Sequence, residues 1–314
     1  MFLNPVRTRT LAALCLGALA MVACSSDGDS PADRATKAVV VGSAPFSESL
    51  IVANMYAGAL QNEGYQVTVR KGLGQREIYL PALEKGGADN GIDLVPEYVG
   101  TLLEFVNKNA GEASGNLDDS VSKLRPRLDA LGLVALNPSP AADQNAFAVT
   151  KATADRLRLK KMSDLTPIAG QLTLGAGAEC SSPNRPFCLL GLEKTYGLKF
   201  KAFKVLDSGG VKTMEALSSG DIDVGLVFSS DGAVAARNLV VLEDDKKLQP
   251  VDNLVPVIRK DIVDDDIRTI LNKVSAAMTT DALIQLNRRA DVDKADPAAL
   301  AQEWLQQHGF VKKK

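Results

Sequence analysis

Short apolar runs alternate with longer amphipathic stretches along the chain from about residue 38 onward. Residues 38–42 are continuously apolar, which is typical of a strand buried on both faces of a parallel sheet. Residues 45–64 instead carry apolar side chains at helical spacing and end at a glycine, which predicts a helix. The repeated strand–helix order predicts an α/β fold in which helices cover both faces of a parallel sheet. We predict strands at 38–42, 66–69, 91–95, 134–136, 146–149, 172–174, 223–227 and 254–258, and helices at 45–64, 76–85, 117–131, 189–196, 211–218, 265–277, 280–290 and 297–308.

Proline-containing turns divide this pattern into two sets of elements. The first set ends near residues 138–140 and the second near Gln249 and Pro250, before a last strand and the closing helices. A chain of 314 residues has the length of two ordinary domains. Residues 82–94 and 216–224 resemble each other, since in both a helix with an Ala-Leu pair precedes a polar glycine turn and a strand. Either the two sets share one plan or the similarity arose by chance between two units of one sheet.

The composition limits the chemistry that this chain can perform. Hydrophobic residues make up 46% and charged residues 24%, with a net charge of -2, as in a soluble globular protein. We expect no nucleic-acid partner, because no basic stripe is present. The single histidine, His308, is expected at the exposed end of the last helix. One histidine cannot supply a His-based catalytic triad or a His-rich metal site, so we expect no enzyme, metal or cofactor.

The N-terminal segment has the features of an export signal. Two arginines precede an uncharged apolar run at residues 11–23, which is too short to span a bilayer but suits a signal-peptide core. An alanine stands directly before Cys24, and this junction resembles a bacterial lipobox, which implies cleavage there and lipidation of the Cys24 sulfur. We therefore predict a signal peptide at residues 1–23 and a flexible tether at residues 24–37. The protein would then be anchored at the outer face of the cell membrane, in the periplasm or at the cell surface; the alternative is an ordinary secretory signal with an incidental cysteine.

Two cysteines remain in the body of the chain. Cys180 and Cys188 bracket a turn-rich segment that contains two prolines. In an oxidising compartment an even pair at this spacing predicts one disulfide.

Short motifs along most of the chain resemble one known family. The matching segments are residues 42–48 (GSAPFSE), 82–86 (ALEKG), 95–101 (VPEYVGT) and 228–232 (FSSDG). In order and spacing they resemble the ProX/OpuC-type substrate-binding proteins of ABC transporters, which bind osmoprotectants such as glycine betaine, choline and related quaternary amines. The resemblance runs from about residue 39 to residue 310.

The resemblance implies a fold, a function and partners. The fold would be a two-lobed, type II-like periplasmic-binding-protein fold with two hinge crossovers and a ligand cleft between the lobes. Lobe I would comprise residues 37–142 plus 252–314, and lobe II residues 143–251. The protein would be a monomer that captures a small organic solute and delivers it to ABC permease subunits in the membrane, with a separate ATPase supplying energy. A ligand-sensing signalling partner with the same fold is the alternative function.

The resemblance also implies the ligand-binding residues. Family members hold a trimethylammonium group in a box of tyrosines, where a cation over aromatic faces is stabilised. The four box positions fall on Tyr98, Asn145, Phe228 and Val251, and a hydroxyl position falls on Thr101. The residues that would bind a ligand carboxylate fall on Ala44, where relatives often have lysine, and on Arg185 in the turn-rich segment. Asp143 is a further candidate, and a hinge Asx-turn is the alternative for it.

These departures from the family pattern change the expected ligand. Asn145 and Val251 replace two tyrosines, and Ala44 replaces a lysine, so the pocket would be more open and more polar. We therefore predict that the ligand is not simple glycine betaine but a larger or less cationic solute.

Overall fold

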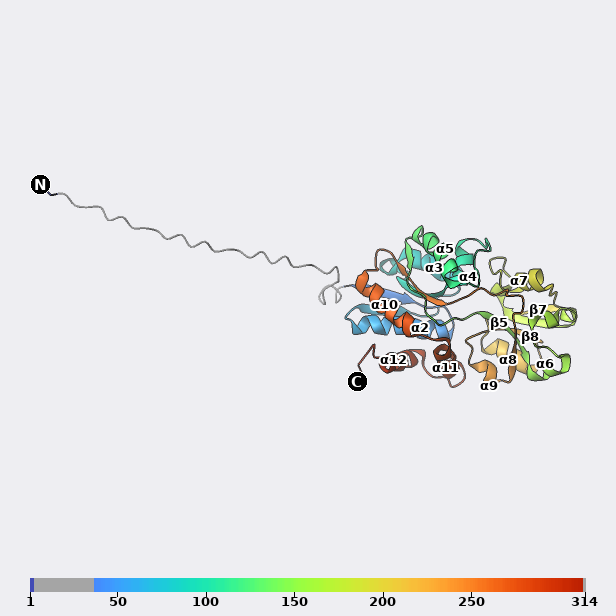
Figure 1. Ribbon diagram of the computed structural model, residues 1–314. Helices are drawn as coiled ribbons and strands as arrows, with labels where there is room; N and C mark the ends of the chain where they lie inside the picture. The colour runs from blue at the N-terminus through green and yellow to red at the C-terminus, as the bar shows by residue number, and fades with distance from the viewer. Residues whose placement is uncertain (3–36, 313–314) are drawn as a thin grey trace.

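The computed structural model describes residues 1, 2 and 37–312, and this part of the chain folds into two lobes (Figure 1). The predicted signal peptide and tether, with the lipidation site Cys24, lie outside the described residues except at residues 1, 2 and 37. No helix in the described part is long and apolar enough to cross a membrane. Each lobe is built around one five-stranded sheet.

The sheet of lobe I has the strand order β2–β1–β3–β10–β4. Strands β1 (Ala38–Gly42), β2 (Gln66–Arg70) and β3 (Leu94–Tyr98) are parallel, as the strand–helix pattern predicts. Strand β10 (Leu254–Arg259) is antiparallel to both of its neighbours, β3 and β4 (Leu133–Ala135), because the chain re-enters the lobe there from lobe II. The sheet is therefore mixed rather than fully parallel.

Helices cover both faces of this sheet (Figure 1). One face carries α2 (Ser47–Asn62), α10 (Asp265–Ala277), α11 (Thr280–Asp291) and α12 (Pro297–Gln307), and the other carries α3 (Arg76–Lys85), α4 (Val99–Val106) and α5 (Leu117–Asp129). The side chains of Asp264, Thr279 and Asp296 accept hydrogen bonds from first-turn amides of α10, α11 and α12. These N-caps satisfy amides that have no partner within the helix, so local sequence determines where the closing helices begin.

The sheet of lobe II repeats the plan of the first, with the order β7–β6–β8–β5–β9. Strands β6 (Thr173–Gly177), β7 (Ala202–Leu206) and β8 (Val224–Phe228) are parallel, and β5 (Asn145–Thr150) is antiparallel to β8 and β9 (Leu239–Leu242). The surrounding helices are α6 (Lys151–Leu157), η2 (Met162–Leu165), η3 (Ala169–Gln171), η4 (Ala178–Ser181), α7 (Leu189–Gly191), η5 (Leu192–Tyr196), α8 (Val211–Ser219) and α9 (Ala233–Ala236).

The internal sequence resemblance occupies equivalent places in the two sheets. Its strand is β3 in lobe I and β8 in lobe II, each the third strand of its sheet. Asp93 accepts a hydrogen bond from the backbone N of Val40 at 2.8 Å, and Asp223 accepts one from Thr173 N at 2.8 Å. In both lobes this carboxylate links the turn before the third strand of the sheet (β3 or β8) to the neighbouring strand (β1 or β6). The two lobes therefore share one plan.

Two extended segments connect the lobes and lie side by side. Ala142 pairs with Asn253 in an antiparallel bridge, and Asp143 N donates a hydrogen bond to Asp252 O at 3.0 Å. We call residues 141–144 and 251–254 the hinge segments. Paired crossover segments of this kind are where a hinge rotation between lobes would be located.

Candidate binding cavity between the lobes

A cavity of about 130 Å³ lies between the lobes beside the hinge segments. Its wall is formed by Ala44, Phe46, Gln75, Arg76, Tyr79, Tyr98, Thr101, Asp143, Asn145, Glu179, Cys180, Arg185, Cys188, Ser208, Leu226, Phe228 and Asp252. Phe46, Asp143 and Phe228 also line a second cavity of about 510 Å³, so the two spaces adjoin. The site can therefore accommodate a compact group with further substituents beyond it.

Aromatic rings from both lobes form one wall of the cavity. Tyr98 and Phe228 are the last residues of the equivalent strands β3 and β8, and binding sites in α/β folds lie at the carboxyl ends of such strands. Phe46, at the start of α2, packs against both, with ring centroids 6.5 Å from Tyr98 and 6.2 Å from Phe228. Tyr79 of α3 adds a fourth ring. The wall offers the aromatic faces that a cationic group prefers.

The hydroxyl of Tyr98 is held by a buried polar cluster that joins the lobes. It donates to Glu48 at 2.6 Å, and the same carboxyl accepts hydrogen bonds from Ser230 Oγ and Asn287 Nδ2, each at 2.6 Å. Ser230 comes from lobe II, whereas Glu48 and Asn287 come from lobe I. Burial raises the pKa of Glu48. The orientation of the Tyr98 ring is thus linked to a contact between the lobes.

The two hinge segments each contribute a buried carboxylate to the cavity. Asp143 accepts a hydrogen bond from Ser230 N at 2.9 Å, and Asp252 accepts from Gly100 N at 2.8 Å and Thr101 N at 3.1 Å. Neither carboxylate is within ion-pair distance of a Lys or Arg side chain in the described part of the chain. Burial raises the pKa of Asp252 to about 7 and that of Asp143 well above its usual value. Burial therefore favours the neutral form of both carboxyl groups, and no protein cation in the described part of the chain stabilises their charged forms by direct contact.

Both arginines of the cavity wall are already paired. Arg76 makes a two-point contact with Glu97, at 2.9 and 2.6 Å, and also donates to Thr101 Oγ1 at 3.1 Å. Arg185 donates to Glu77 at 3.1 Å. A guanidinium in such a contact has less capacity to bind a ligand carboxylate.

The structure brings together most of the residues that the sequence singled out. Ala44, Tyr98, Thr101, Asp143, Asn145, Arg185 and Phe228 all line the cavity. Val251 does not: its backbone N donates to Ser114 O at 3.1 Å, and both residues line a separate cavity. Successive side chains of an extended segment point to opposite sides, so the neighbour Asp252 faces the binding cavity instead. In this structure the predicted fourth box residue, Val251, therefore lies outside the cavity wall.

Sequence reasoning missed Phe46, Tyr79 and Asp252 as lining residues. Phe46 lies inside the GSAPFSE motif, and Asp252 lies two residues after the proline that marked the second hinge. The sequence therefore contained a feature from which each could have been predicted as a lining residue. Tyr79 had none beyond its aromatic side chain. With these residues the aromatic wall is more complete than the loss of two tyrosines indicated.

The two cysteines also lie on this wall. Cys180 and Cys188 are buried, their Cα atoms are 5.2 Å apart and the structure pairs their sulfurs, a spacing within the range of disulfides. Within the described residues, no group of His, Cys, Asp and Glu side chains is arranged to hold a metal ion.

Two α/β lobes, two crossovers and an aromatic cavity between them define a two-lobed solute-binding protein. The chain matches the family model for the substrate binding domain of the ABC-type glycine betaine transport system over residues 37–307, and it belongs to this family. Proteins of this family are extracytoplasmic solute-binding components of ABC transporters and not enzymes.

Individual relatives agree with this assignment. The chain is 29% identical over 285 residues to a glycine-betaine-binding protein of Pseudomonas aeruginosa, covering 86% of this chain and 88% of that protein. It is 28% identical over 292 residues to the glycine betaine-binding protein YehZ of Escherichia coli, covering 89% and 93%. A solved glycine betaine/carnitine/choline ABC transporter structure superposes with a TM-score of 0.69 at 27% identity, covering 87% of this chain and 99% of that one. The chain is thus a substrate-binding component of an ABC transporter for betaine- and carnitine-type solutes, and the predicted two-lobed fold is confirmed.

Proposed function

We propose that this protein captures a small quaternary ammonium cation without a carboxylate, such as choline, for an ABC importer. The supporting observation is the pair of buried carboxylates, Asp143 and Asp252, beside an aromatic wall and without a paired protein cation. A quaternary cation gains ring contacts there, and by Coulomb attraction it would stabilise the charged forms of the two carboxyl groups. A ligand carboxylate would find no free cation to pair with, since Ala44 stands where a lysine would help and Arg185 is already paired.

The solute would lie against Phe46, Tyr98 and Phe228, with Asn145 available for a hydrogen bond. The carboxylates favour a fully cationic solute over the less cationic one that the missing tyrosines suggested. The adjoining 510 Å³ cavity leaves room for substituents larger than those of glycine betaine.

The proposal includes the setting of the protein in the cell. After export and cleavage before Cys24, a lipid on Cys24 would anchor a monomer whose lobes comprise residues 37–142 plus 252–314 and residues 143–251. In that oxidising compartment Cys180 and Cys188 would form a disulfide. The closed protein would dock on membrane permease subunits, and a separate ATPase would supply energy.

Calorimetry with choline, glycine betaine and carnitine tests the ligand assignment. We expect choline to bind at least about tenfold more tightly than glycine betaine, with glycine betaine weaker than about 0.1 mM. Replacing the Phe46 ring in F46L should weaken choline binding about two- to thirtyfold, since one cation–ring contact contributes ~0.5–2 kcal/mol. The matched control F203L changes a lobe II phenylalanine outside the cavity and should bind as the native protein does. Tighter binding of glycine betaine than of choline would contradict the proposal.

A further inference from the structure

The segment from Cys180 to Cys188, here the cysteine loop, is the part of lobe II that closes one side of the cavity. Both cysteines and Arg185 line the cavity. Inside the loop, Arg185 N donates to Ser182 O at 3.0 Å and Cys188 N donates to Arg185 O at 3.2 Å. The loop is therefore a series of turns, and the pairing of its two sulfurs holds its ends together.

The cysteine loop contacts lobe I at two points. Asn109 Nδ2 donates a hydrogen bond to Pro183 O at 2.7 Å. Arg185 binds Glu77 at 3.1 Å, and its guanidinium carbon lies 5.7 Å from the centre of the Phe105 ring. These contacts cross the cleft at a distance from the hinge segments, so lobe opening must break them.

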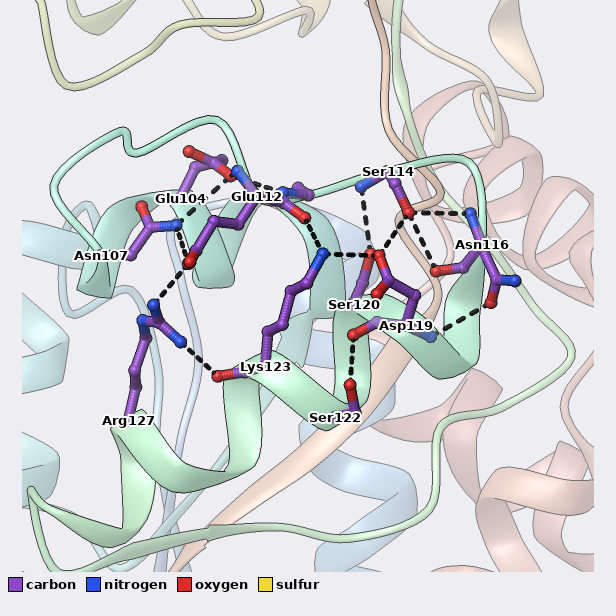
Figure 2. A network of polar contacts seen from close by, with 11 residues as sticks. Glu104, Asn107, Glu112, Ser114, Asn116, Asp119, Ser120, Ser122, Lys123 and Arg127 are labelled. Atoms are coloured by element: carbon purple, nitrogen blue, oxygen red, sulfur yellow. Dashed lines mark hydrogen bonds and ion pairs between the residues drawn. The ribbon is translucent and has the colours of Figure 1, made fainter.

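The lobe I side of this contact is the α4–α5 loop, residues 107–116, which an internal polar network orders (Figure 2). The carboxylate of Glu104, only 1% exposed, accepts hydrogen bonds from Gly111 N at 2.7 Å and from Glu112 N and Ala113 N, each at 2.6 Å. Three amides on one carboxylate fix the loop backbone. Asn109 itself adopts a left-handed conformation, with φ of 62°, which asparagine tolerates better than most residues. The network therefore presents the Asn109 amide in a fixed position.

We propose that Asn109 and the cysteine loop form a latch that holds the lobes together over bound solute. Asn109 does not line the cavity, yet it controls how fast solute leaves, because each opening must break its bond to Pro183. The cross-link is part of the latch, since it keeps the Pro183 carbonyl in reach of Asn109. Asn109 is thus a positioning residue for the lobes and not a ligand contact.

Hydrogen exchange and solute release test the latch together. In the N109A variant without solute, amides of residues 181–189 in lobe II should exchange faster, while those of β7 should not change. Stopped-flow release of choline from N109A should be about two- to tenfold faster, the effect of losing one hydrogen bond. The matched control N62A removes an exposed amide at the end of α2 and should change neither quantity. In a C180S/C188S background the effect of N109A on release should shrink, because the loop is no longer held in place.

The hydrogen-exchange experiment tests the latch without any ligand, whereas the release experiment also rests on the proposed function. If the native protein does not bind choline, the ligand assignment fails, and hydrogen exchange alone decides on the latch. If N109A matches N62A in exchange at residues 181–189, the latch does not exist. An additive effect of N109A in the C180S/C188S background would show that the cross-link has no part in it.

Discussion

At the scale of single residues, the carboxyl group of Asp252 couples solute binding to pH. Its pKa is about 7 in the protein without solute, because burial disfavours the charged form. A cation binds the carboxylate form, so its affinity rises with pH until Asp252 is fully deprotonated. We expect choline affinity to increase at least about tenfold from pH 6 to pH 8, because the raised pKa of Asp143 adds to the effect of Asp252. Calorimetry in buffers of different ionisation enthalpy measures both the affinity and the released protons.

The D252N variant is the control for this coupling. Its amide oxygen can still accept the hydrogen bonds from Gly100 N and Thr101 N, while its charge no longer changes with pH. A pH-independent affinity in the native protein would contradict the assignment. Without solute the folded protein holds the Asp252 proton more tightly than the unfolded chain does. The Tm of the unliganded protein should therefore fall as pH rises from about 4 to about 7, and choline should offset the fall.

Cavity-lining residues were most readily predicted where a motif marked them. Tyr98 stands in a recognisable segment at the end of a predicted strand, and Phe228 begins another. The contact of Phe46 with Phe228 joins residues far apart in the chain, and such contacts depend on tertiary packing. Whether Val251 or Asp252 faces the cavity depends on which alternate side chains of one extended segment point inward. The hydrophobic pattern does not determine this at a hinge.

At the scale of elements, the start of α4 lies close against the second hinge segment. A Cβ added at Gly100 would come within 2.7 Å of Val251 O and 2.8 Å of Pro250. We expect G100A to reduce the free energy of unfolding by ~1–3 kcal/mol. It should also weaken choline binding, because Tyr98 and Thr101 flank the displaced turn. Urea denaturation and calorimetry measure the two effects.

Gly115 provides the matched control for this substitution. An added Cβ there meets nothing within 4 Å, so G115A should leave stability and affinity close to those of the native protein. Native-like affinity in G100A would mean that α4 tolerates displacement from the hinge and that its close approach does not position the cavity wall.

The closing helices were predicted, whereas α4, α6, β7 and β9 were missed. The closing helices carry both helical spacing and N-cap residues, so their positions agree with the prediction. Strand β7 is an edge strand with largely exposed side chains, Val205 among them at 59%, and it leaves no apolar pattern to detect. The predicted helix at 189–196 is a short α7 followed by the π-helical turn η5.

At the scale of the whole molecule, the proline turns predicted the division into two sets of elements, and the family resemblance implied the two lobes with their two crossovers. The antiparallel course of β5 and β10 could not, because it follows from the chain crossing between lobes and not from either strand's own sequence. The cavity volume and the pairing of Arg185 with Glu77 likewise depend on how the two lobes meet.

Attachment of the whole molecule to the membrane is expected to depend on Cys24. In C24S the lipid cannot be added, so exported protein should move from the membrane fraction to the soluble fraction. The control C15S changes a cysteine inside the predicted signal peptide and should leave the protein in the membrane fraction. Mass spectrometry of the native N-terminal peptide should show a diacylated Cys24. Membrane-bound C24S protein would mean that another feature anchors the chain.

The position of Asp143 and Asp252 on the hinge segments determines what an arriving solute first meets. Atoms near the axis of a hinge rotation move least, so the carboxyl groups of Asp143 and Asp252 would keep nearly the same position in the open and closed forms. Phe228 and the cysteine loop lie further from that axis and would move by a larger distance. Under the proposed function, a cationic solute would therefore contact these two carboxyl groups first, and closure would then bring the Phe228 ring of lobe II against it.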